Sequence, residues 1–183
     1  MSPISSDPSG SRRIRRLALA VRLLSALGAL VLLGLPPLFW SRPGWVQRVA
    51  EQEWGARLVQ LDVGARWAGL AASALPVAVG LWALWEIWRL FGCYGRGELL
   101  ALRPAGHLHR LGLALVAQAA ALPLGQTLAV LALTMGNPPG QRQLIFRLSS
   151  DHYMSLLFGL VLLALAAVMR EAARVADENA AFV

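Results

Sequence analysis

Long uncharged stretches recur along the chain and predict its architecture. Four of them contain no Asp, Glu, Arg or His and are 17 to 26 residues long: residues 23–40, 67–85, 111–136 and 153–169. A transmembrane helix needs about 20 mostly apolar residues, whereas barrel strands alternate in segments of about ten. Aromatic residues that favour the membrane interface stand at the ends of these stretches, at Trp40, Trp67, Trp85, Trp88 and Tyr153. The pattern predicts an all-α, integral membrane four-helix bundle.

The charge that remains predicts the orientation of this bundle. The chain of 183 residues is 57% hydrophobic and 15% charged, and its net charge of +7 comes from arginine alone, since it has no lysine. Eleven of the 17 arginines flank the spans on the side of the two termini, and six lie on the other side. Cytoplasmic loops carry the basic excess, so we expect both termini in the cytoplasm. Because the arginines punctuate the spans and form no face with interleaved aromatics, we expect no direct nucleic-acid binding.

The segments outside the spans have separate expected structures. Residues 1–11 are rich in Ser and Pro and read as a disordered leader, and residues 12–183 form a single four-span membrane domain. In the first loop, Pro43 and the apolar residues Trp45, Val46 and Ala50 predict a short amphipathic extracytoplasmic helix. Two interpretations of it stay open, a ligand-sensing element and an interface-anchored connection. Residues 170–183 extend the last span as a helical cytoplasmic tail, in which Glu171 and Glu178 are spaced to pair with Arg174. Gly95 and Gly97 are expected to end the helix that carries the second span.

Small and polar side chains inside the spans indicate close helix packing. The third span carries Gln118 and Gln126 on either side of Pro123, and small residues repeat at four-residue spacing at Ala117, Ala121 and Gly125, with a matching Gly69-x-x-x-Ser73 step in the second span. These faces suit a neighbouring helix of the same chain or a homodimer. The two glutamines also suit a polar path, so a small transporter or channel subunit is an alternative function. The absence of ionisable residues from the spans argues against ion-coupled transport.

No catalytic, metal-binding or cofactor-binding set emerges, and we therefore expect a protein that is not an enzyme and has no cofactor. His107 and His109 are two residues apart and point away from each other on a helix. The adjacent residues Ser150, Asp151 and His152 do not form a triad geometry. Glu86 and Glu98 lie near arginines at the cytoplasmic edge and are interpreted as solvated ion pairs.

Two cytoplasmic patches carry a family resemblance. The first lies in residues 89–110, here called the elbow, and the second in the tail: Leu90-Phe91, Tyr94, Gly97-Glu98, Arg110-Leu111-Gly112, Arg170-Glu171-Ala172, Glu178-Asn179 and Val183. At these residues the chain resembles the bacterial four-span membrane proteins called domain of unknown function 2975. Members typically have an apolar residue, Phe and a hydroxyl residue after the Gly-Glu pair, where this chain has Leu99-Leu100-Ala101. The resemblance implies a multi-pass protein of the bacterial inner membrane, and a small helix-turn-helix regulator as partner.

We therefore predict a non-enzymatic regulatory or scaffold protein whose elbow and tail form one cytoplasmic docking surface. The residues expected to form it are Tyr94, Gly97, Glu98, Leu99, Leu100, Glu171, Glu178 and Asn179. A purely structural interpretation stays open, in which the elbow and the tail cap each other and hold the bundle together.

Overall fold

The computed structural model describes residues 8–57, 61–98 and 101–180, and the regular elements of these ranges are all helices. They are α1 (Pro8–Trp40), α2 (Pro43–Gln52), α3 (Val63–Gly95), α4 (Leu102–Thr134) and α5 (Ser150–Ala180). All except α2 are long and apolar enough to cross a membrane, which confirms the prediction of an all-helical chain with four spans. The expected leader comprised residues 1–11. Residues 1–7 lie outside the described residues, and residues 8–11 belong to α1, which begins at Pro8.

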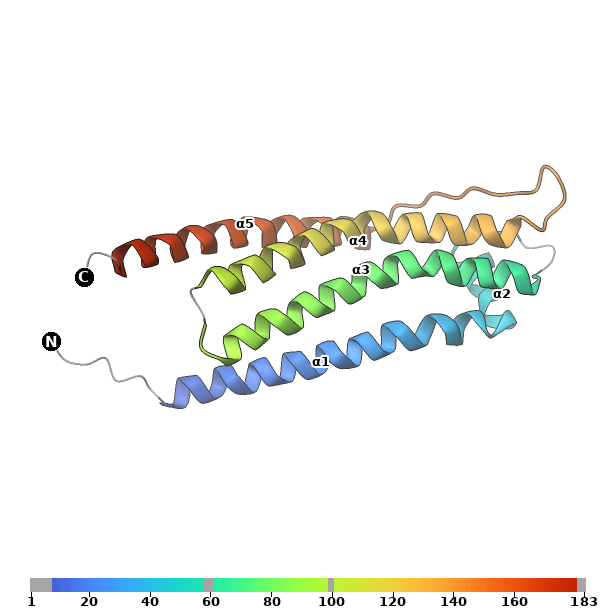
Figure 1. Cartoon of the computed structure of the whole chain (residues 1–183). Coiled ribbons are helices and arrows are strands. Elements are labelled where there is room, and N and C mark those ends of the chain that lie inside the picture. The colour runs from blue at the N-terminus through green and yellow to red at the C-terminus, as the bar shows by residue number, and fades with distance from the viewer. Residues whose placement is uncertain (1–7, 58–60, 99–100, 181–183) are drawn as a thin grey trace.

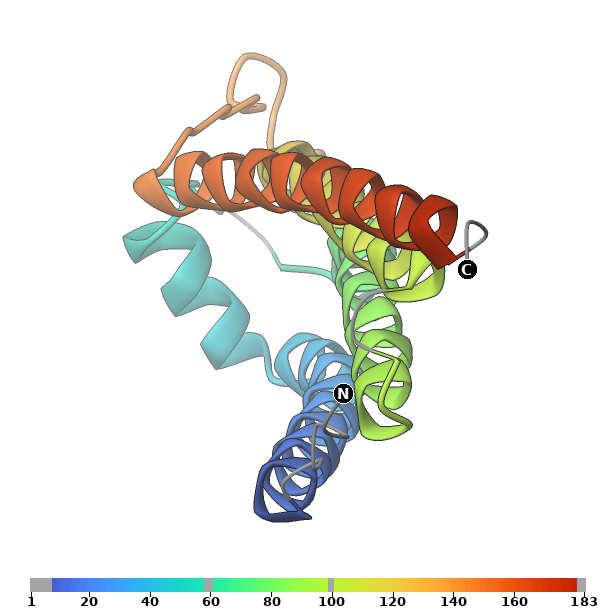
Figure 2. The ribbon, with the colours of Figure 1, turned by 90° about the vertical axis from the view of Figure 1, so that its left-hand side faces the viewer.

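The four long helices pack in chain order. In the described residues α1 contacts α3, α3 contacts α4, and α4 contacts α5. Figure 2 shows the result end-on, with α3 and α4 between α1 and α5 and with α2 to one side of this row. The start of α1, the end of α3, the start of α4 and the end of α5 lie at the same end of the bundle, here called the elbow end (Figure 1). The opposite end, which holds α2, is called the α2 end.

Trp40, predicted as an aromatic residue at the end of a span, fastens α1 to α3. Its side chain is only 4% exposed, and its Nε1 donates a hydrogen bond of 2.9 Å to the hydroxyl of Ser73. The indole ring lies where a side chain at Gly69 would be. The small residues Gly69 and Ser73 thus accommodate the indole ring of Trp40, because only a residue without a Cβ at position 69 leaves room for the ring.

Glycines set the close approach of the other helix pairs. A Cβ at Gly125 of α4 would lie 2.9 Å from Cδ of Pro76 in α3, which confirms that the predicted small face meets a neighbouring helix. The α4–α5 crossing depends on two glycines that no predicted face included. A Cβ at Gly159 would lie 2.9 Å from the carbonyl oxygen of Gly112, and a Cβ at Gly112 would lie 2.9 Å from that of Gly159.

The last helix is shifted along α4 toward the elbow end. The Ser155 hydroxyl, close to the start of α5, donates to the Leu115 carbonyl in the first half of α4. The connection between the end of α4 and the start of α5 runs back along α4 as extended chain (Figure 1). The hydroxyls of Thr127 and Thr134 hold it by donating to the carbonyls of Ile145 and Gln143. The shift carries the tail of α5 past the first turn of α4.

The α2 end is the best-packed part of the described molecule. Val46 and Ala50 of α2 are fully buried in one apolar cluster with Val130 and Leu133 of α4. The two loops at this end are also joined, because the Asn137 amide donates to the carbonyl of Arg57. The predicted helix in the first loop therefore exists as α2, beginning at Pro43, with Val46 and Ala50 packed on protein and Trp45 exposed.

We predict that Gly159→Ala destabilises the protein by about 1–3 kcal/mol, because its Cβ meets backbone of α4 at less than 3.0 Å. Thermal unfolding of the purified protein in detergent measures the effect. The matched control is Gly34→Ala in α1, whose Cβ meets no atom within 4 Å and which should leave Tm unchanged or slightly higher. Equal Tm values for the two variants would contradict the crossing described here.

Candidate functional site

The elbow begins with a glycine-terminated helix end. α3 ends at Gly95, and Gly97 adopts a φ of +84°, a conformation that glycine takes without strain. The amides of Gly97 and Glu98 then donate to the carbonyls of Tyr94 and Cys93, which satisfies the last turn of the helix in the Schellman arrangement. Gly97 therefore has a clear structural role in turning the chain.

Glu98, the next predicted docking residue, is bound to its own neighbour. Arg96 Nε donates to its carboxylate at 2.8 Å. This hydrogen bond lowers the pKa of the Glu98 carboxyl below its ordinary value, so Glu98 stays ionised at neutral pH and offsets the charge of Arg96. Leu99 and Leu100, which were expected to follow it on the same surface, lie outside the described residues.

The tail meets the elbow from the other side. Tyr94 packs against a cluster of Leu90, Leu108 and Ala166, which joins α3, α4 and α5. Where α5 passes the start of α4, the two helices line a groove of about 470 Å³, here called the elbow–tail groove: Leu102, Ala167, Arg170, Glu171, Arg174, Asp177 and Glu178. Of the predicted tail residues, Glu171 and Glu178 thus line a groove together with one elbow residue, Leu102. Asn179 is exposed one residue beyond.

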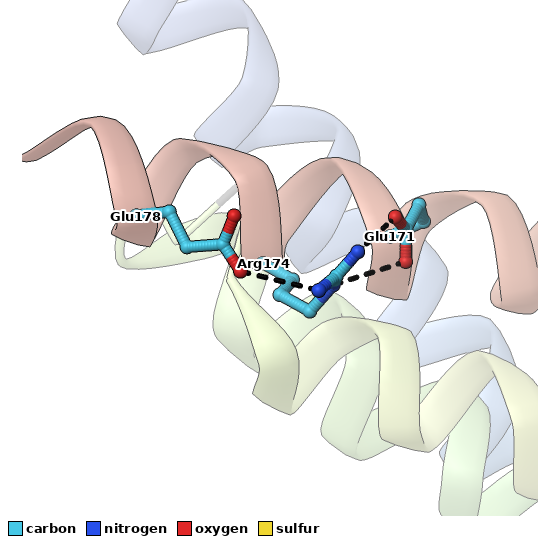
Figure 3. A network of polar contacts seen from close by, with 3 residues as sticks. All are labelled: Glu171, Arg174 and Glu178. Atoms are coloured by element: carbon cyan, nitrogen blue, oxygen red, sulfur yellow. Dashed lines mark hydrogen bonds and ion pairs between the residues drawn. The ribbon is translucent and has the colours of Figure 1, made fainter.

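Charges along the groove are connected in series. Arg174 donates hydrogen bonds to Glu171, which lies one helical turn before it, and to Glu178, which lies one turn after it at 3.2 Å (Figure 3). Such pairs stabilise an exposed helix by a few tenths of a kcal/mol each. The groove therefore has a charged rim over an apolar floor formed by Leu102 and Ala167.

A second cavity lies between α1, α3 and α4. Its volume is about 680 Å³, and it is here called the arginine pocket after the five arginines that line it: Arg22, Arg89, Arg96, Arg103 and Arg110. None of the described residues lining this pocket is acidic. Sequence reasoning used these arginines as orientation signals, and Arg110 also as part of the family resemblance, but did not predict that they gather in one cavity.

Glu86 behind this pocket corrects the sequence interpretation of a solvated ion pair with arginine. It is only 4% exposed, and its Oε2 lies 2.7 Å from Nδ1 of His107, which is 8% exposed. The partner is a histidine 21 residues away, on the next helix. Two polar residues of opposite helices, both buried, form one contact because each would otherwise lack a hydrogen-bond partner.

The two intramembrane glutamines do not form a visible path. Gln118 and Gln126 are both half-buried on α4, and neither lines the arginine pocket or the elbow–tail groove. The side-chain oxygen of Gln118 is buried and has no hydrogen-bond partner among the described residues.

We predict that Glu86→Leu and His107→Leu each lower stability by about 1–3 kcal/mol, because each leaves one buried polar group unpaired. The double variant should lose less than the sum of the two, since it removes both groups. Unfolding of all four proteins in detergent gives the coupling energy. Glu98→Leu, at the partly exposed Arg96–Glu98 pair, is the control and should change Tm little. Strict additivity of Glu86→Leu and His107→Leu would show that the pair is uncoupled.

Comparison with known proteins places this arrangement in a family. No curated protein and no solved structure matches the chain. The family model described as "Protein of unknown function (DUF2975)" matches residues 55–183, which include α3, α4, α5 and the whole elbow. The matched part is well over half of the chain, so this chain belongs to the DUF2975 family of proteins of unknown function.

Proposed function

We propose that this protein is a non-enzymatic regulatory or scaffold protein of the bacterial inner membrane, with its elbow end in the cytoplasm, and that it docks a cytoplasmic protein in the elbow–tail groove. The observation that carries the proposal is the overhang of α5, which places the charged tail beside Leu102 of the elbow. Leu102 remains 54% exposed there, next to the exposed Ala167. An apolar floor within a charged rim is the usual anatomy of a protein interface.

The charge of the rim indicates the chemistry of the partner. Three carboxylates line the groove, at Glu171, Asp177 and Glu178, against two guanidinium groups, at Arg170 and Arg174. Arg174 is already bound to two of the carboxylates, and Arg170 lies 3.1 Å from Nδ1 of His109. The groove therefore favours an amphipathic segment with basic residues beside apolar ones. A small helix-turn-helix regulator is the partner that the family resemblance suggests.

A photo-crosslinking amino acid in place of Ala167 tests this docking in living cells. We expect a covalent adduct with a cytoplasmic protein, and none when the amino acid replaces the exposed Leu144 near the α2 end. Combining it with Asp177→Arg and Glu178→Arg should reduce the adduct at least about tenfold, because like charges then face the partner.

The matched control is Glu51→Arg, a charge reversal at an exposed position of α2, which should leave the adduct unchanged. An adduct with the mass of two copies of this chain, or no adduct at Ala167, would contradict the proposal.

A transporter or channel subunit is the alternative function. The buried, unpartnered oxygen of Gln118 favours it, because a passing polar solute could supply the missing hydrogen bond. Gln118→Leu separates the two cases. If the amide only occupies space between helices, the variant should unfold at a higher temperature, because a buried unpaired polar atom costs about 1–3 kcal/mol. If the amide lines a path, a liposome flux assay should lose transport while the protein stays folded.

A further inference from the structure

The arginine pocket is built from two copies of one sequence pattern. At the end of α3 and its C-cap residue Arg96 the chain reads Arg89-x-x-Gly92-Cys93-x-x-Arg96, and on α4 it reads Arg103-x-x-Gly106-His107-x-x-Arg110. Positions separated by three, four and seven residues lie on one face of a helix. Each helix therefore presents two arginines, two turns apart, with a glycine between them, and all of these residues line the pocket.

The positive charge in the pocket is mostly unneutralised. Within the described residues Arg96 pairs with Glu98, but no carboxylate forms an ion pair with Arg22, Arg89, Arg103 or Arg110. Arg22 reaches in from α1, with its guanidinium carbon 4.2 Å from the ring centroid of Trp88. Its Nε is buried and has no hydrogen-bond partner in the described structure. A buried donor without a partner, among converging cations, indicates a place for an anion.

The glycines leave room for that anion. A Cβ at Gly106 would meet no atom within 4 Å, and one at Gly92 would meet only the end of the flexible Arg96 side chain, at 3.7 Å. The floor of the pocket is therefore open between the arginines. A guanidinium group binds two phosphate oxygens at once, so arginines that converge from several helices suit a phosphate group.

The surface beside the pocket indicates where the anion comes from. One turn from Arg89 toward the α2 end, the same face of α3 carries Trp85, which is 58% exposed. Three residues from Arg110, the same side of α4 carries Leu113, which is 41% exposed. An exposed apolar surface thus continues from the arginines along the candidate spans. A lipid would place its phosphate at the arginines and its chains on this surface.

We propose that the arginine pocket binds the phosphodiester headgroup of an anionic lipid, held by Arg22, Arg89, Arg103 and Arg110. The site shares Leu102 with the elbow–tail groove, but none of its four arginines lines that groove, and the proposal does not depend on partner docking. The two matching helix patterns provide the phosphate ligands, and α1 closes the pocket with Arg22. Arg22 lies outside the part of the chain that matches the family model, whereas the α3 and α4 arginines lie within it.

Native mass spectrometry of the purified full chain in detergent tests the proposal with phosphatidylglycerol as the probe. We expect it to bind at least about tenfold more tightly than phosphatidylcholine, which carries a neutralising cation. Arg89→Gln with Arg110→Gln should weaken phosphatidylglycerol binding at least about tenfold, because two charge-assisted contacts are lost. The matched control is Arg48→Gln with Arg142→Gln, which removes the same charge from exposed positions at the α2 end and should leave binding unchanged.

Gly106→Leu tests whether weaker lipid binding could result from a loss of folding. It keeps every arginine, extends into open space and should raise helix stability, yet it should block the pocket and weaken lipid binding. Equal binding of the two lipids, or equal losses in the two double arginine variants, would overturn the site. Displacement of the lipid by an equal concentration of inorganic phosphate would overturn the lipid as the source of the anion.

Discussion

Glu86 and His107 meet at 2.7 Å between α3 and α4, and Gly125 lies against Pro76 nearer the α2 end of the same helix pair. The rest of the molecule depends on this pair, because α1 attaches to α3 and α5 attaches to α4 in the described residues. Between membrane spans the hydrophobic effect offers little drive for association, so close packing and interhelical hydrogen bonds hold helices together. In the α3–α4 pair, Gly125 provides the close packing and the buried contact of Glu86 with His107 provides the interhelical hydrogen bond.

The shift of α5 toward the elbow end has the largest consequence for function. If α5 lay level with α4, its tail would pack along the first turns of α4 and would not project past Leu102. The crossing at Gly112 and Gly159 instead carries the tail past the first turn of α4, so that Leu102 and the tail line one groove. Leu102 consequently lines both the elbow–tail groove and the arginine pocket. Two cavities of different charge share one helix start, which makes the elbow end the chemically varied part of the described structure.

The candidate site was partly accessible from the sequence. Gly97, Glu171 and Glu178 stand where the helix-stop and charge-pair patterns place them, since such patterns depend on neighbours within one turn. Glu86 was misread because several arginines lie close to it in the sequence, while its partner is on another helix. The arginine pocket was missed for a related reason: the repeated arginine-glycine pattern on α3 and α4 is legible in the sequence, but a single pattern does not indicate that the two copies face each other.

The sequence by itself determined the number of long apolar helices, their helical character and the glycine stop within the elbow, because hydropathy and backbone preference are properties of short segments. Only the tertiary structure decided that Trp40 is buried against Gly69, that α5 slides along α4, and that the arginines of three helices converge. Helical periodicity indicates which residues share a face. It does not say which helix that face will meet or at what height, because both are decided by contacts between residues far apart in the chain.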